Sequence, residues 1–146
     1  MPERLVINGN GATVSLAVHG YENEQATAGS DADWLRCFIH VRVLGFECQT
    51  PLSLTTQDLS SFAKSLTTAY VALAGEAPLE TDEGQLRLVV TFGRSGTVQV
   101  EGEIGNVGRP KADLSFSFDS DQTFVKGAVE ALEGLTEQYP TRSGST

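Results

Sequence analysis

The chain has 146 residues, of which 40% are hydrophobic and 20% charged, and its formal net charge at pH 7 is −9. This length and composition are typical of one globular domain, so we predict a single domain over residues 1–146. The excess of carboxylates argues against nucleic acid as a partner, because affinity for a phosphate backbone depends on Lys and Arg. The sequence contains neither a long apolar segment nor a basic and then apolar leader, which predicts a cytoplasmic protein that does not enter a membrane.

The chain is expected to open with a β-hairpin. Residues 4–8 and 13–18 alternate in polarity, and the sequence Asn-Gly-Asn-Gly at 8–11 between them favours a tight turn. Residues 21–33 are polar and show no period, so we expect a flexible loop there.

A second pair of strands and a helix follow. Residues 34–44 alternate clearly, and residues 46–50 are predicted to form the partner strand, which Pro51 ends because proline cannot donate to a ladder. Thr55 suits the N-cap of a helix, and Asp58 lies three residues later, near the spacing of a capping box. Gly75 is expected to stop this helix, whose apolar stripe is Leu59, Phe62, Ala63, Leu66, Tyr70 and Leu73.

The second half repeats strands and then a helix. Residues 76–84 are rich in turn formers, and three alternating strands are predicted over 85–92, 97–104 and 112–118. The predicted fold is therefore α+β, with a mostly antiparallel sheet of about six or seven strands and two amphipathic helices packed on one face.

The second helix is expected to start from Ser120 or Asp119 as its cap and to end before Pro140. Residues 141–146 then form a frayed tail. The apolar positions of this helix follow the helical period: Phe124, Ala128, Leu132, Leu135 and Tyr139.

The residues that usually carry catalysis are sparse. His19 and His40 are the only histidines, and both are predicted to lie at the surface of strands or turns. Cys37 and Cys48 lack metal-site spacing and are expected to be small apolar thiols in strands, with a disulfide between them as the less favoured alternative. We therefore predict no catalytic residues, no metal site and no cofactor.

Four segments resemble the WapI-type family of small bacterial proteins. They are the start of the long strand at Asp33-Trp34-Leu35, the helix cap over 54–59 leading to Phe62, the hairpin strand 96–100, and residues 116–123. The resemblance extends over the arrangement of residues 33–138. It implies an immunity protein, which neutralises the toxin domain of a contact-dependent system, and it implies no catalytic residues.

One open sheet face is the predicted contact surface, because it would combine apolar side chains with charges of both signs. The first hypothesis is a non-enzymatic antagonist that binds a basic toxin domain. The alternatives are a self-associating scaffold protein and an enzyme of unknown class. The predicted face consists of Arg36, Phe38, His40, Arg42, Arg87, Val89, Gln99 and Glu101.

Overall fold

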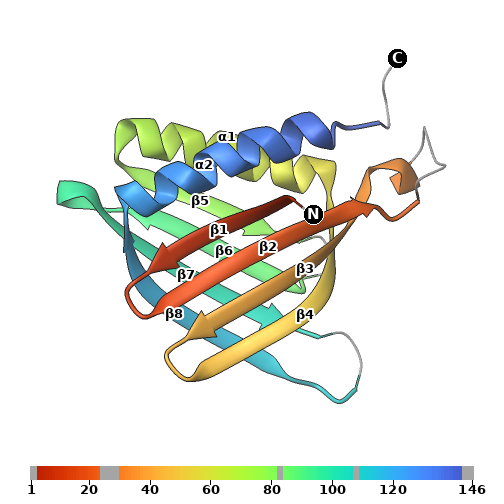
Figure 1. The fold of residues 1–146 in the computed structure, drawn as a ribbon, viewed down its shortest axis with the longest axis horizontal. Helices are drawn as coiled ribbons and strands as arrows, with labels where there is room; N and C mark the ends of the chain where they lie inside the picture. The colour runs from red at the N-terminus through yellow and green to blue at the C-terminus, as the bar shows by residue number, and fades with distance from the viewer. Residues whose placement is uncertain (1–2, 24–29, 82–83, 107–108, 143–146) are drawn as a thin grey trace.

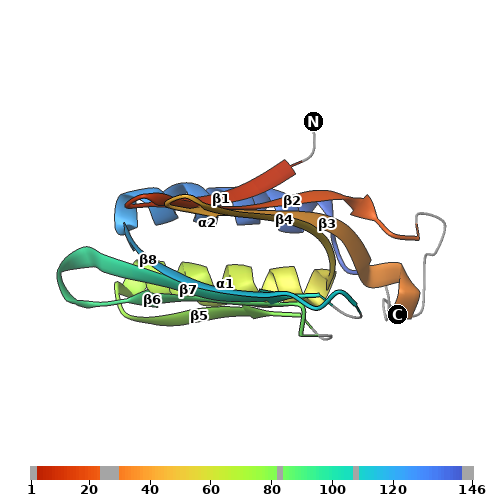
Figure 2. The same cartoon turned by 90° about the horizontal axis from the view of Figure 1, so that it is seen from below.

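The computed structural model describes residues 3–23, 30–81, 84–106 and 109–142. Its strands form two antiparallel sheets that lie one over the other as two layers (Figures 1 and 2). The first sheet has the order β1 (Glu3–Gly9), β2 (Ala12–Tyr21), β3 (Trp34–Val43) and β4 (Phe46–Thr55). The second has the order β5 (Gly75–Glu80), β6 (Leu86–Phe92), β7 (Thr97–Gly105) and β8 (Asp113–Asp121).

The α+β class and the antiparallel pairing are confirmed, but the prediction of one sheet with six or seven strands is wrong. There are two sheets of four strands each. The additional strand is β5, which overlaps residues 76–84, where the sequence favoured turns. Ala77 and Leu79 of this strand are buried while Glu76, Pro78 and Glu80 are exposed, so a short period-two pattern was present.

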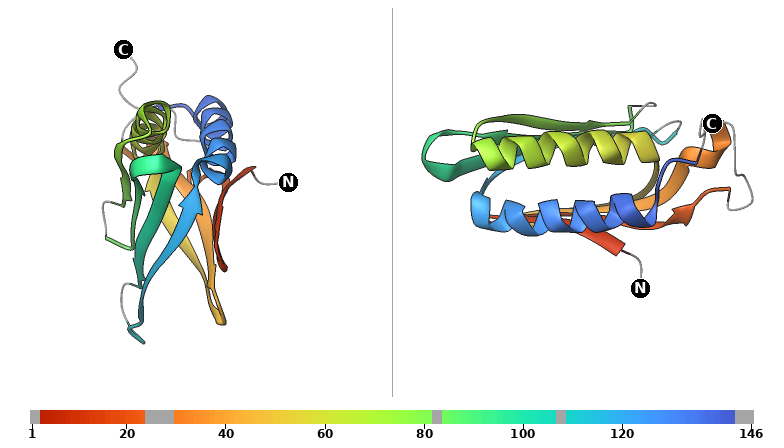
Figure 3. Two further views of the ribbon diagram at one scale, coloured as in Figure 1. Left: turned by 90° about the vertical axis from the view of Figure 1, so that its left-hand side faces the viewer. Right: turned by 90° about the horizontal axis from the view of Figure 1, so that it is seen from above.

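Two helices of 17 residues each, α1 (Thr56–Ala72) and α2 (Gln122–Gln138), run antiparallel along one side of the sandwich (Figures 1 and 3). Helix α1 packs against β5, α2 packs against β1, and the two helices contact each other. The helices therefore close the side between the sheets and do not cover one face of a single sheet as predicted. The reason is that each sheet already covers the apolar face of the other. Neither described helix is both long and apolar enough to cross a membrane.

One hydrophobic core lies between the two sheets and under the helices. Along β3 and β6 nearly all of the inward-facing residues are buried, and most of their outward neighbours are exposed or half-buried, because the outer face of each sheet contacts solvent. The core includes Leu35 and Ile39 of β3, Leu88 and Val90 of β6, Phe62 and Leu66 of α1, and Leu132 and Leu135 of α2.

The first helix cap is confirmed. The Asp58 backbone N–H donates to Thr55 Oγ1 at 3.1 Å, and the Thr55 N–H donates to Asp58 Oδ2 at 3.0 Å, which completes a capping box. The cap of α2 is Asp121 and neither of the predicted residues, Ser120 or Asp119. Helix α1 ends at Leu73 with a left-handed φ of 53°, so Gly75 starts β5 and does not stop the helix.

Strand β4 continues through Pro51 to Thr55, contrary to the prediction. The β3–β4 hairpin has a two-residue loop, so the residue pair that closes it, Val43–Phe46, exchanges backbone hydrogen bonds. Along the antiparallel ladder, hydrogen-bonded pairs then alternate with non-hydrogen-bonded pairs. The pair Phe38–Pro51 is then non-hydrogen-bonded. The proline nitrogen faces the open edge of the sheet, where no ladder bond is lost.

The two sheets are joined at one corner. The Asn10 N–H in the β1–β2 turn donates to the Asp119 carbonyl of β8 at 2.9 Å, and Ser120 Oγ donates to the Asn8 carbonyl at 2.6 Å. A Cβ at Gly9 would overlap both the Phe118 ring and the Asp119 carbonyl, so this close approach requires glycine.

The C-terminal segment is fixed to the start of β3. The Arg142 backbone N–H donates to Asp33 Oδ1 at 2.7 Å, and its Nε donates to the Ala32 carbonyl at 3.0 Å. The Arg142 guanidinium lies 3.5 Å from the centre of the Tyr21 ring, and the Tyr21 hydroxyl donates to the Pro140 carbonyl at 2.6 Å.

These contacts correct part of two predictions. Thr141 and Arg142, expected in the frayed tail, are hydrogen-bonded to other elements, and residues 143–146 lie outside the described part of the chain. Within the predicted flexible loop 21–33, residues 30–33 form a short 3₁₀ helix, whereas residues 24–29 are not described.

Candidate functional site

The predicted contact face is divided between the two sheets. Arg36, Phe38, His40 and Arg42 lie on β3, on the outer face of the first sheet, while Arg87, Val89, Gln99 and Glu101 lie on β6 and β7 of the second. The structure therefore brings each group of four together but not the eight. The sequence pattern identified the outward register correctly, but it does not say which strands share a sheet.

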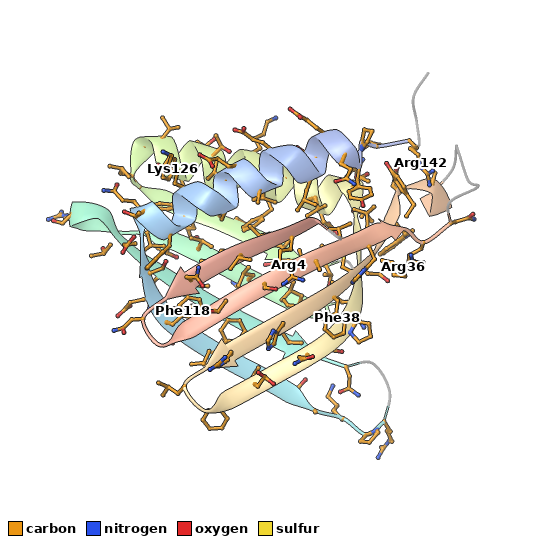
Figure 4. The ribbon with its side chains drawn as sticks, viewed as in Figure 1. Arg4, Arg36, Phe38, Phe118, Lys126 and Arg142 are labelled. Carbon is orange, nitrogen blue, oxygen red and sulfur yellow. The ribbon has the colours of Figure 1, made fainter. Side chains whose placement is uncertain are left out.

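The outer face of the first sheet is basic among its described side chains. Arg4, Arg36 and Arg42 are exposed there, and Arg4, Arg36 and Phe38 belong to the strands nearest the viewer in Figure 4. His40 Nε2 lies 3.1 Å from Glu47 Oε2. The contact with the His40 side chain lowers the pKa of the Glu47 carboxyl below its usual value, so this acidic group is already paired.

The outer face of the second sheet is acidic. Its strands carry a single basic residue, Arg87, whose Nε donates to Glu80 Oε1 at 3.1 Å and which lies opposite Glu103 in the β6–β7 register. Arg87 is therefore paired with Glu80 across the β5–β6 ladder. We define the acidic face by the exposed carboxylates that point outward from this sheet: Glu76, Glu80, Glu101, Glu103, Asp113 and Asp119.

A shallow depression of about 360 Å³ lies on the acidic face. Its floor and rim include Arg87, Glu101, Glu103, Ser115 and Ser117. Beside it Val89, expected to be an exposed apolar contact residue, is only 7% exposed. Val89 lies between Pro78 and Glu101 on the neighbouring strands, so the apolar part of this face is covered and the carboxylates dominate it.

An apolar groove of about 310 Å³ lies on the side of the sandwich opposite the helices, between the β3–β4 hairpin and β8. Leu44 and Phe46, at the tip of that hairpin, are 76% and 71% exposed. We call this the edge groove and define it by the apolar residues Val41, Val43, Leu44, Phe46, Leu114 and Phe116.

The edge groove was not predicted from the sequence. Residues 112–118 are predicted only as an alternating strand, and β8 places Leu114 and Phe116 on its inner face, where both are only partly buried. The signal for an open groove was the short turn Leu44-Gly45 followed at once by Phe46, which places two large apolar residues at a hairpin tip.

The thiols and histidines do not form a reactive centre among the described residues. Burial raises the pKa of the Cys37 thiol to about 12, and burial also raises the pKa of Cys48. Both cysteines are free, as expected. Cys48 lies opposite Val41, four residues along β3 from Cys37, which is too far for a disulfide. No group of three His, Cys, Asp or Glu side chains in the described ranges could hold a metal ion.

Comparison with known proteins agrees with the resemblance noted in the sequence. No curated protein matches this chain. The sequence profile of the Immunity protein WapI-like family matches residues 4–140, which include all eight strands and both helices except the first residue of β1. The chain therefore belongs to the Immunity protein WapI-like family.

Proposed function

We propose that this protein is a non-enzymatic, immunity-type antagonist that binds the basic surface of a toxin domain through its acidic face. Family membership supports the class of function. The surface is supported by one observation: six exposed carboxylates and a single, already paired arginine occupy the outer face of the second sheet, whereas three arginines are exposed on the outer face of the first.

This distribution of charge favours one orientation of a basic partner. Carboxylates on a flat sheet attract a cationic surface over long range and accelerate association, and the three arginines on the opposite side repel it. The net charge of −9 alone would not distinguish between the two sides of the molecule. The separation of carboxylates on one outer face from arginines on the other does distinguish them.

Charge reversal tests the proposal. The partner to test is any basic toxin domain that a neighbouring gene encodes. The double variant Glu101→Lys/Glu103→Lys should weaken binding to it by about tenfold or more at low salt, because the variant removes complementary charges and adds repulsive ones. The measurement is calorimetry or surface plasmon resonance at two salt concentrations. Rising salt should reduce the difference between wild type and variant.

The matched control is Glu130→Lys/Glu133→Lys on the exposed side of α2, which changes the net charge by the same amount. This variant should bind nearly as well as the wild type. Equal losses of affinity in the two variants would mean that only net charge matters, and would contradict the acidic face as the binding surface. Lack of binding between the wild type and the neighbouring toxin domain would contradict the proposed function itself.

Self-association is a second candidate function, favoured by the exposure of Leu44 and Phe46 at the tip of the β3–β4 hairpin. Light scattering of the samples used for the binding measurements separates the two. A stable dimer that dissociates when the toxin domain is added would leave both functions in place, whereas a dimer that excludes the toxin domain would support the scaffold.

A further inference from the structure

We infer that the free edge of β8 is a β-strand addition site, which takes an extended segment of the partner as a fifth strand of the second sheet. This inference rests on the proposed function and specifies how the partner is held. The segment alternates apolar and basic residues, with the apolar side chains in the edge groove and the basic ones toward the acidic face.

The four sheet edges of the molecule differ in how they are protected. Edge strands expose unpaired backbone groups, and proteins usually cover or block them. Helix α2 packs along β1 and helix α1 packs along β5. The third edge, β4, carries Pro51 with its nitrogen facing outward, and a proline there offers no donor to an added strand.

The remaining edge, β8, has no such protection between Asp113 and Ser117. It carries no proline, and no helix packs along this stretch. Its two serines, Ser115 and Ser117, are small and exposed. The β1–β2 turn covers this edge only near Asp119, beyond the stretch in question.

Hydrogen bonds fix which backbone groups of β8 point outward. The Asp119 carbonyl accepts from Asn10, outside the second sheet, whereas the Ala112 carbonyl accepts from Asn106 on the side of β7. Backbone direction alternates along an antiparallel strand, so the odd-numbered residues of β8 direct their N–H and C=O groups away from β7. Ser115 and Ser117 therefore present a donor and an acceptor each to an incoming strand.

The edge groove and the acidic face lie on the two sides of this free edge. Ser115, Phe116 and Ser117 line both the groove of about 310 Å³ and the acidic depression of about 360 Å³. Successive side chains of an added strand point to opposite sides of a sheet. An added strand would thus place one set of side chains against Leu114 and Phe116 and the other set beside Glu103 and Asp113.

Charge decides between a partner segment and a second copy of this chain. Pairing β8 with β8 of another copy would bring two acidic faces into one continuous sheet, so that Asp113 and Asp119 of each copy would lie near carboxylates of the other. Such like-charge neighbours destabilise strand pairing. A segment with Lys or Arg at alternate positions removes this repulsion and satisfies the same backbone groups.

The test uses a synthetic, end-blocked peptide of seven residues that alternates lysine and valine. We expect wild-type protein to bind it and, on binding, to protect the Ser115 and Ser117 amides from hydrogen exchange. The amides of Leu114 and Phe116 already face β7 and should change little. Peptides with proline at the central position, or with glutamate in place of lysine, should not bind. This exchange experiment needs no variant of the protein.

The matching protein variant is Ser117→Pro, which removes an outward N–H without breaking a bond to β7. It should weaken binding of the lysine and valine peptide, and of the toxin domain, about tenfold, as expected for the loss of one or two hydrogen bonds. The control Gln49→Pro places a proline at the equivalent outward position of β4 and should bind as the wild type does.

The outcomes separate this inference from the proposed function. Loss of toxin binding in Glu101→Lys/Glu103→Lys but not in Ser117→Pro would leave the acidic face in place and overturn strand addition. Exchange protection at β4 instead of β8, or a dimer formed through β8 in the absence of peptide, would also overturn it. If neither variant alters toxin binding, the result contradicts both binding through the acidic face and strand addition at β8 for this partner.

Discussion

At the residue scale, Leu44 holds an unfavourable backbone conformation while exposing most of its side chain. Its φ is 54°, in the left-handed region, which costs a non-glycine residue about 1–2 kcal/mol relative to right-handed geometry. We therefore expect Leu44→Asn to raise the free energy of unfolding in urea by about 0.5–1 kcal/mol, because asparagine tolerates this region. The same variant should bind the peptide or the toxin domain more weakly, since Leu44 lines the edge groove.

Leu73 provides a matched control for that prediction. It is also left-handed, with φ 53°, and 44% exposed, but it caps α1 on the side of the molecule away from the edge groove. Leu73→Asn should stabilise the fold to a similar extent and leave peptide binding unchanged. Equal binding by wild type and Leu44→Asn would remove Leu44 from the contact surface.

A second prediction at this scale concerns pH. The pKa of Cys37 is raised from 9.0 to about 12 by burial, so the folded state keeps its thiol proton where the unfolded chain loses it. The stabilisation is complete below pH 9 and decreases by about 1.4 kcal/mol per pH unit as the pH rises from 9 towards 12. In urea titrations at pH 8, 9.5 and 10.5, Cys37→Val should lose stability less steeply than the wild type. Cys48→Val is the comparison: burial raises the pKa of Cys48 as well, but Cys48 is only partly buried, so this variant should differ from the wild type less than Cys37→Val does. Parallel curves for Cys37→Val and wild type would contradict the assignment.

At the scale of elements, the sequence correctly predicted features that depend on residues close together in the chain. It did not predict features that depend on contacts between distant segments. The capping box at Thr55 and Asp58 and the alternation along β3 follow from local chemistry and were predicted correctly. The continuation of β4 through Pro51 depends on which side of the strand is paired, which no local pattern contains. The strand β5 was missed because its six residues include a glycine and a proline, which favour turns unless β6 and α1 lie alongside.

For the candidate site too, the sequence predicted local features but not the topology. The sequence identified the outward residues of β3, β6 and β7, including Glu101 on the acidic face. It could not show that β3 and β6 belong to different sheets, because alternation in a strand reveals two faces but not their neighbours. Separation of the arginines from the carboxylates is therefore a property of the topology and not of any single strand.

At the scale of the whole molecule, each half of the chain depends on the other. Four strands and a helix occur twice in succession, but α1, which follows the first sheet, packs on β5 of the second, and α2 packs on β1 of the first. The core under both helices is continuous. Removal of one half would leave the other half with an uncovered edge strand and with a helix whose apolar stripe has lost the strand it packs on.

Because each helix packs on the sheet of the other half of the chain, we predict that the two sheets unfold cooperatively. Leu66 of α1 is fully buried, so Leu66→Ala should destabilise the fold by about 2–5 kcal/mol. Helix α1 follows the first sheet in sequence but packs on the second in space. We therefore expect Leu66→Ala to lower the stability of both sheets equally. Native-state hydrogen exchange checks this at the amides of Ile39 in β3 and Val90 in β6, with the exposed Lys64→Ala as the control. A decrease in protection at Val90 alone would mean that the two sheets open independently, and the acidic face could then unfold while the first sheet remains intact.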